Sequence, residues 1–79
     1  MNFIYHLGVD AMTQQALREH LFYLINKYVP ESNRSDFFES ILKDDVPVKG
    51  ILADLNRVKD VTMDEKDGDL LREIYFNFC

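Results

Sequence analysis

The stretch ALREHLFYLINKYV, residues 16–29, decides the fold because its apolar residues repeat at the spacing of an α-helix. They form two neighbouring rows, which are Leu17, Leu21, Leu24 and Tyr28 in the first and Phe22, Ile25 and Val29 in the second. At about 3.6 residues per turn, the two rows merge into one broad apolar face. The pattern therefore predicts a long helix that packs against several partners at once.

Three further segments repeat the same helical spacing. Together with the first, they predict an all-α fold, a compact bundle of four short helices at residues 13–29, 33–43, 47–58 and 63–77. The predicted inner faces of the last three helices are Phe37, Phe38, Ile41 and Leu42; Val48, Ile51, Leu52, Leu55 and Val58; and Leu70, Leu71, Ile74, Tyr75 and Phe78.

Local signals mark where the helices begin and end. Thr13 is a good N-cap for the first helix, with Asp10 as the alternative, and Pro30 ends it because proline cannot continue the hydrogen-bond ladder. Thr62 and Glu65 form an S/T-x-x-E capping box, which predicts the start of the fourth helix. Two glycines lie within the predicted helices. A close approach by a neighbouring backbone, or chance, would explain Gly50, whereas Gly68 would bend the fourth helix or delay its start.

The length of 79 residues predicts a single domain, residues 1–79, with a thin stability margin. Residues 1–12 are predicted to be an arm or irregular segment, since the apolar run 2–9 is too short for its periodicity to separate strand from helix. Cys79 is the one cysteine in the sequence, so no internal disulfide can form, which suits a reducing cytoplasm.

The net charge of −5 argues against nucleic acid as a partner, because binding phosphate needs clustered Lys and Arg. No apolar run approaches the ~20 residues that span a bilayer, and no basic leader opens the chain. We therefore expect a cytoplasmic protein with no membrane association and a basic protein as its partner.

No motif in the sequence predicts catalysis, a metal site or a cofactor. His6 and His20 lack the nearby ligands that a metal site needs. A calcium loop with Gly68 at its sixth position would place Met63 and Ile74 where carboxylates are required. The serines have no glycine-flanked elbow, and a terminal cysteine is a poor place for a shaped active site. The sequence therefore predicts that the chain is not an enzyme.

Two surface features are candidates for binding. The first is an acidic strip with Tyr23 beside it, and the candidate partner-binding residues are Asp44, Asp45, Asp60, Asp64, Glu65, Asp67, Asp69 and Tyr23. In an antiparallel bundle the strip would divide into two patches at opposite ends, unless the helices cross steeply; helix capping and solvation alone are the competing explanation. The second is surplus aromatic area, at Tyr23 and Phe76 among others, of the kind that marks interfaces.

The second half of the chain resembles small all-helical immunity proteins of bacterial toxin systems, including the Maf-type ones. The resemblance lies in Asp44-Asp45, the run Lys49-Gly-Ile-Leu-Ala-Asp-Leu55, and Val61-Thr-Met-Asp-Glu65 before an amphipathic last helix. It implies an acidic inhibitor that binds a basic, often nucleolytic, toxin, or a host enzyme if the source is a phage. The alternative is a structural or regulatory homodimer that uses the surplus apolar surface.

Overall fold

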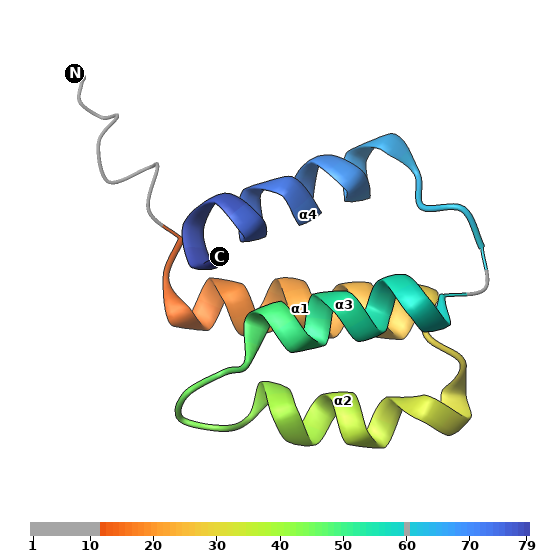
Figure 1. Cartoon of the computed structure of the whole chain (residues 1–79), viewed down its shortest axis with the longest axis horizontal. Helices are drawn as coiled ribbons and strands as arrows, with labels where there is room; N and C mark the ends of the chain where they lie inside the picture. The colour runs from red at the N-terminus through yellow and green to blue at the C-terminus, as the bar shows by residue number, and fades with distance from the viewer. Residues whose placement is uncertain (1–11, 60) are drawn as a thin grey trace.

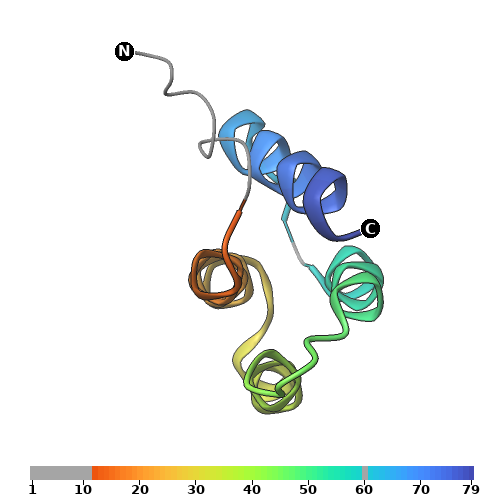
Figure 2. The same ribbon diagram turned by 90° about the vertical axis from the view of Figure 1, so that its left-hand side faces the viewer.

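The computed structural model describes residues 12–59 and 61–79, which form a bundle of helices without a strand. The elements are α1 (Gln14–Tyr28), the short 3-10 helix η3 (Glu31–Asn33), α2 (Arg34–Ile41), α3 (Val48–Val58) and α4 (Glu65–Phe78). Successive α-helices run in alternating directions (Figure 1), and the end-on view shows α1 and α3 on opposite sides of the bundle (Figure 2). The predicted all-α bundle is confirmed. The predicted arm lies outside the described residues except for Met12.

One apolar core joins all four α-helices. Leu21 of α1 and Leu52 of α3, both predicted to be inside, are almost completely buried. Phe22 of α1 and Phe38 of α2 pack at its edge with ring centroids 5.2 Å apart. The buried apolar residues are Leu17, Leu21, Leu24, Ile25, Tyr28, Val29, Phe37, Ile41, Val46, Val48, Ile51, Leu52, Leu55 and Ile74.

Side chains form hydrogen bonds with backbone groups at the helix ends that have no partner within the helix. Thr13 caps α1 as predicted, its Oγ1 accepting a hydrogen bond from the Ala16 N–H at 3.0 Å. At the other end of α1, Arg34 Nε donates to the Val29 carbonyl at 2.8 Å. Arg18 does the same for α2, donating from Nε to the carbonyl of its last residue, Ile41, at 3.1 Å and from Nη2 to the carbonyl of Lys43 in the following turn at 2.9 Å. Since the last carbonyls of a helix lack partners within it, both arginines stabilise helix ends.

Two residues of the predicted inner faces lie on the surface. Leu42 is 66% exposed, because α2 ends at Ile41 and Leu42 belongs to the turn that follows. Tyr75 of α4 is 41% exposed, because the buried face of that helix is centred on Ile74 and Asp67. The predicted inner faces of α2 and α4 were therefore wider than the faces that are buried.

The start of α4 differs from the predicted capping box. The N-cap is Asp64, whose side chain accepts a hydrogen bond from the Asp67 N–H at 3.1 Å, so the box at Thr62 and Glu65 is wrong by two residues. Gly68 lies inside the first turns of α4 and does not delay its start. A Cβ at Gly50 would meet nothing within 4 Å, so close approach of a backbone does not explain that glycine.

Among the helices at residues 12–59 and 61–79, none is both long enough and apolar enough to cross a membrane.

Candidate functional site

The predicted acidic strip is divided between the two ends of the bundle. Asp44 and Asp45 lie exposed in the turn between α2 and α3, and Asp64, Glu65, Asp67 and Asp69 belong to the start of α4. Figure 1 shows these two connections at opposite ends, because α3 runs the length of the bundle between them. The expectation of two separate patches is therefore confirmed. Asp60 lies outside the described residues.

Asp67 does not face a partner, because its side chain is turned into the bundle and only 4% exposed. Its carboxylate accepts three hydrogen bonds from α1: from Tyr28 Oη at 2.5 Å, Lys27 Nζ at 2.8 Å and Tyr23 Oη at 2.9 Å. The prediction of Asp67 as a surface contact is corrected: it is a buried anion that joins α4 to α1.

The contacts of Asp67 shift the pKa values of Asp67, Lys27 and Tyr28. Burial acts to raise the pKa of Asp67, but the hydrogen bonds from Lys27, Tyr28 and Tyr23 outweigh it and lower that pKa to about 2. Hydrogen bonds to Asp67, then to Asp64 and Tyr23, raise the pKa of Lys27 far above its usual value. Burial, followed by the hydrogen bond to Asp67, raises the pKa of the Tyr28 phenol. At neutral pH the cluster therefore contains a carboxylate–ammonium pair, Asp67 and Lys27, and the neutral phenol of Tyr28.

The predicted contact residue Tyr23 belongs to the same cluster. Its side chain is 46% exposed, yet its hydroxyl donates to Asp67 and accepts from Lys27 Nζ at 3.1 Å. The Lys27 ammonium also lies 5.5 Å from the ring centroids of Tyr23 and Tyr28, within the range of a cation–π interaction. Tyr23 is thus partly exposed while its hydroxyl forms hydrogen bonds within the molecule.

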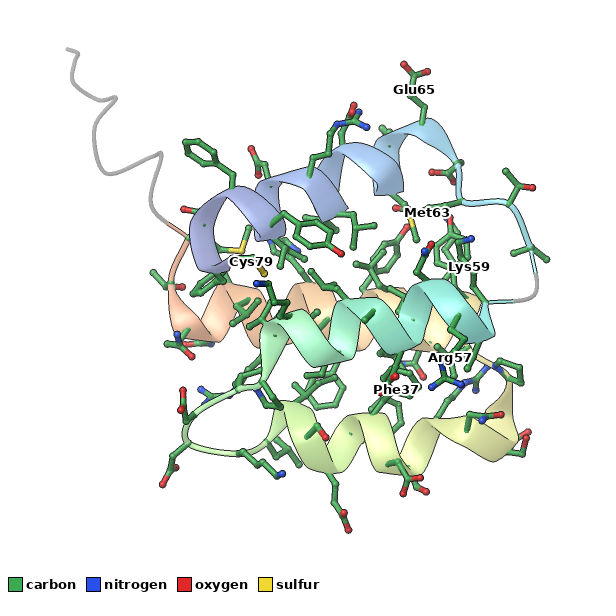
Figure 3. All side chains as sticks on the ribbon, viewed as in Figure 1. Phe37, Arg57, Lys59, Met63, Glu65 and Cys79 are labelled. Carbon is green, nitrogen blue, oxygen red and sulfur yellow. The ribbon has the colours of Figure 1, made fainter. Side chains whose placement is uncertain are left out.

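Two of the remaining acids of the α4 patch also have internal roles. Asp64 caps α4 and forms an ion pair with Lys27 at 3.0 Å. Asp69 pairs with Arg72 one turn along the same helix. Glu65 points away from the bundle (Figure 3). Helix capping, which the competing explanation named, accounts for Asp64, whereas the internal pairing of Asp67 and Asp69 was not predicted.

The Asp44–Asp45 patch has a different character. Both carboxylates are exposed and form no ion pair with any residue that the structure describes. They border a shallow depression of about 410 Å³. Its other lining residues are Gln14, Val46, Pro47, Val48, Lys49, Gly50 and Phe78. This end of the bundle combines free negative charge with a concave, partly apolar surface.

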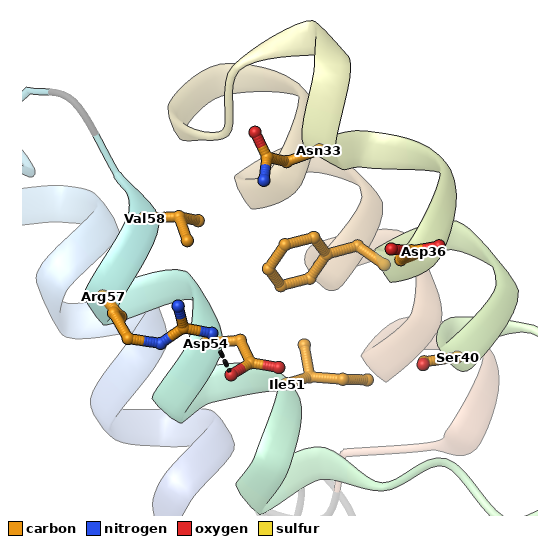
Figure 4. Close-up of a pocket in the computed structure, with 8 residues that line it drawn as sticks. Asn33, Asp36, Ser40, Ile51, Asp54, Arg57 and Val58 are labelled. Carbon is orange, nitrogen blue, oxygen red and sulfur yellow. Dashed lines mark hydrogen bonds and ion pairs between the residues drawn. The ribbon is translucent and has the colours of Figure 1, made fainter.

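A second hollow, which the sequence analysis missed, opens between α2 and α3 (Figure 4). It extends to the N-terminal end of α2 and the C-terminal end of α3. Its volume is about 180 Å³, and the η3–α2 side and α3 contribute its walls. The lining residues are Asn33, Asp36, Phe37, Ser40, Ile51, Asp54, Arg57 and Val58. No sequence signal identifies this hollow, because its walls come from two helices that only the folded structure brings together.

The most exposed large apolar side chain in the described part of the chain is Phe76, at 86%. It lies on the face of α4 opposite Ile74, as the helical spacing predicted. The surplus of aromatic surface is confirmed at this position and at Tyr23.

Within residues 12–59 and 61–79, no three His, Cys, Asp or Glu side chains are grouped so that they could hold a metal ion. Comparisons with protein-family models, with curated proteins and with solved structures find no match to this chain.

Proposed function

We propose that the chain is a small acidic protein-binding module that neutralises a basic protein, as an immunity or inhibitor protein does. The observation that carries the proposal is the Asp44–Asp45 patch, two exposed carboxylates without internal partners beside a concave surface. Their negative charge is not used in an ion pair within the described chain, so it is free to attract a basic partner.

The distribution of the cations supports the same proposal. Arg18 and Arg34 donate to backbone carbonyls at helix ends, and Lys27 is bound to Asp64 and Asp67. Four further lysines, Lys43, Lys49, Lys59 and Lys66, form no ion pair among the described residues, and unpaired cations are still fewer than unpaired acids. Among the described residues, the acids that form no ion pair are Glu19, Glu31, Asp36, Glu39, Asp44, Asp45, Glu65 and Glu73.

Such a surface acts mainly on the association rate. Complementary charge steers a partner toward the correct face, and the gain falls as salt screens the charges. A toxin or nuclease with a basic active site fits this chemistry, since the inhibitor then occupies the surface that would bind an anionic substrate.

The test uses basic proteins encoded beside this chain's gene, purified one at a time, with the association rate measured at low and at high salt. The variant Asp44→Asn/Asp45→Asn should slow association several-fold at low salt and have little effect at high salt. A matched control, Glu19→Gln/Glu73→Gln, removes the same charge elsewhere and should slow association less. Absence of binding to every such protein, or equal effects of the two double variants, would refute the proposal.

A homodimer is the second candidate, and Phe76 is the observation that favours it. An apolar ring 86% exposed to solvent is often buried by a second molecule. Light scattering across a range of concentrations should then give twice the monomer mass, and Phe76→Ser should return the chain to a monomer. A monomer at all concentrations favours the inhibitor.

A further inference from the structure

We propose that the hollow between α2 and α3 receives one arginine side chain of the basic partner. This inference rests on the proposed function and adds to it a second contact, at the other end of the α2–α3 hairpin from Asp44 and Asp45. The argument uses the size of the hollow, its charge and the chemistry of its walls.

The size of the hollow fits a single side chain. Its volume is about 180 Å³. Pockets for cofactors and other small molecules usually measure about 300–1,000 Å³, so this one is too small for that class of ligand. Protein interfaces, in contrast, commonly place one anchor side chain in a small pocket, and arginine is among the residues enriched at such positions.

The charge of the hollow favours a cation. Two carboxylates and one guanidinium line it, and Arg57 Nη2 pairs with Asp54 Oδ1 at 2.8 Å (Figure 4). Asp36 forms no ion pair with any other described residue, so its charge is left uncompensated at the rim. The Asp54–Arg57 pair is exposed and therefore weak, so the Asp54 carboxylate can also accept from an incoming donor.

The walls select arginine among the cations. Phe37, Ile51 and Val58 form the smaller, apolar part of the lining, which the methylene stem of a long side chain can contact. The planar guanidinium can donate to a carboxylate in two parallel bonds, which the compact lysine ammonium cannot do. Asn33 and Ser40 add neutral acceptors at the rim.

The first experiment uses N-acetyl-arginine amide as the probe, because it carries the guanidinium and no other charge. Amide chemical shifts of the isotope-labelled protein are followed by NMR as the probe is added. The expected result is saturable shifts confined to residues around the hollow, with weaker binding of the neutral isostere N-acetyl-citrulline amide. Shifts scattered over the surface, or equal binding of the two amides, would overturn the inference.

The second experiment changes the hollow while leaving the fold and its internal contacts in place. Asp36→Asn removes the unpaired carboxylate and should weaken probe binding about three-fold or more. The matched control is Glu39→Gln, an equal change of charge on the same helix at an exposed residue outside the hollow, and it should leave probe binding within error. Equal effects of the two variants would contradict an arginine site.

The same variants are then tested on a protein partner. If a partner binds the unaltered chain and Asp36→Asn leaves the dissociation rate unchanged, the arginine anchor is wrong and the proposed function stands. If no basic partner binds the unaltered chain, the proposed function fails, and with it the assignment of the hollow to a partner's arginine.

Discussion

The replacement Asp67→Asn should destabilise the protein more than any other change of a single charge in α4. An amide offers one acceptor oxygen in place of two, and its NH₂ group would have to face Lys27 or a tyrosine hydroxyl. The side chain is buried, so water cannot make up the lost hydrogen bonds. The replacement would therefore weaken the hydrogen bonds from Tyr23, Lys27 and Tyr28 that hold α4 to α1.

The size of the effect follows from the charge state of Asp67. Its pKa is lowered from 3.8 to about 2. At about 1.4 kcal/mol per pKa unit, the ionised form contributes roughly 2 kcal/mol of stability at neutral pH. The unsatisfied partners left by an amide add to this, so we expect Asp67→Asn to lower the free energy of unfolding by roughly 2–4 kcal/mol.

The pH dependence gives the prediction a second, independent check. Because the pKa is lower in the folded state, the contribution is complete above the unfolded pKa and disappears as the pH falls toward about 2. About half of it should be lost near pH 3. The difference in stability between the unaltered protein and Asp67→Asn should therefore shrink between neutral pH and pH 3.

Urea denaturation followed by circular dichroism measures both quantities. The control is Asp69→Asn on the same helix, whose exposed ion pair with Arg72 should contribute no more than about 1 kcal/mol. A loss below about 0.5 kcal/mol for Asp67→Asn would refute the assignment of Asp67 as a buried anion. So would a difference that stays constant as the pH falls.

The other predictions concern the core and the cap of α4. Leu21→Ala and Leu52→Ala should each cost about 2–5 kcal/mol in urea denaturation, because both side chains are buried in one core, and a loss under about 1 kcal/mol at both sites would contradict the packing described. Asp64→Ala should cost about 1 kcal/mol, because it removes the N-cap of α4, whereas Thr62→Ala should change stability by less than about 0.5 kcal/mol. If thermal melts instead showed a larger loss for Thr62→Ala than for Asp64→Ala, Thr62 and not Asp64 would be the N-cap of α4.

The sequence predicted the helices well because their signals are local. Thr13 and Pro30 bound α1 through hydrogen-bonding rules that involve only near neighbours. The positions of Leu21 and Leu52 follow from helical period alone. Leu42 was assigned to the inner face of α2 because the helical period cannot show that this helix already ends at Ile41.

The role of Asp67 was hidden for the opposite reason. Its hydrogen-bond partners lie about forty residues earlier in the chain, so no local rule connects them. The run DEKDGD has the composition of a solvated surface. One signal was present all the same, since Asp67 shares the helical phase of Leu70, Leu71 and Ile74. A carboxylate in phase with an inner face is a candidate for a buried, paired acid.

The structure therefore separates two kinds of acid that the sequence presents alike. Asp64, Asp67 and Asp69 each lie beside a cation of the same chain, and their negative charge stabilises the fold. Asp44 and Asp45 form no ion pair with any described residue, although Lys49 lines the same depression, and their charge makes no comparable contribution to the fold. For this reason a test for partner binding belongs at the α2–α3 hairpin rather than at the start of α4, although acids are denser there.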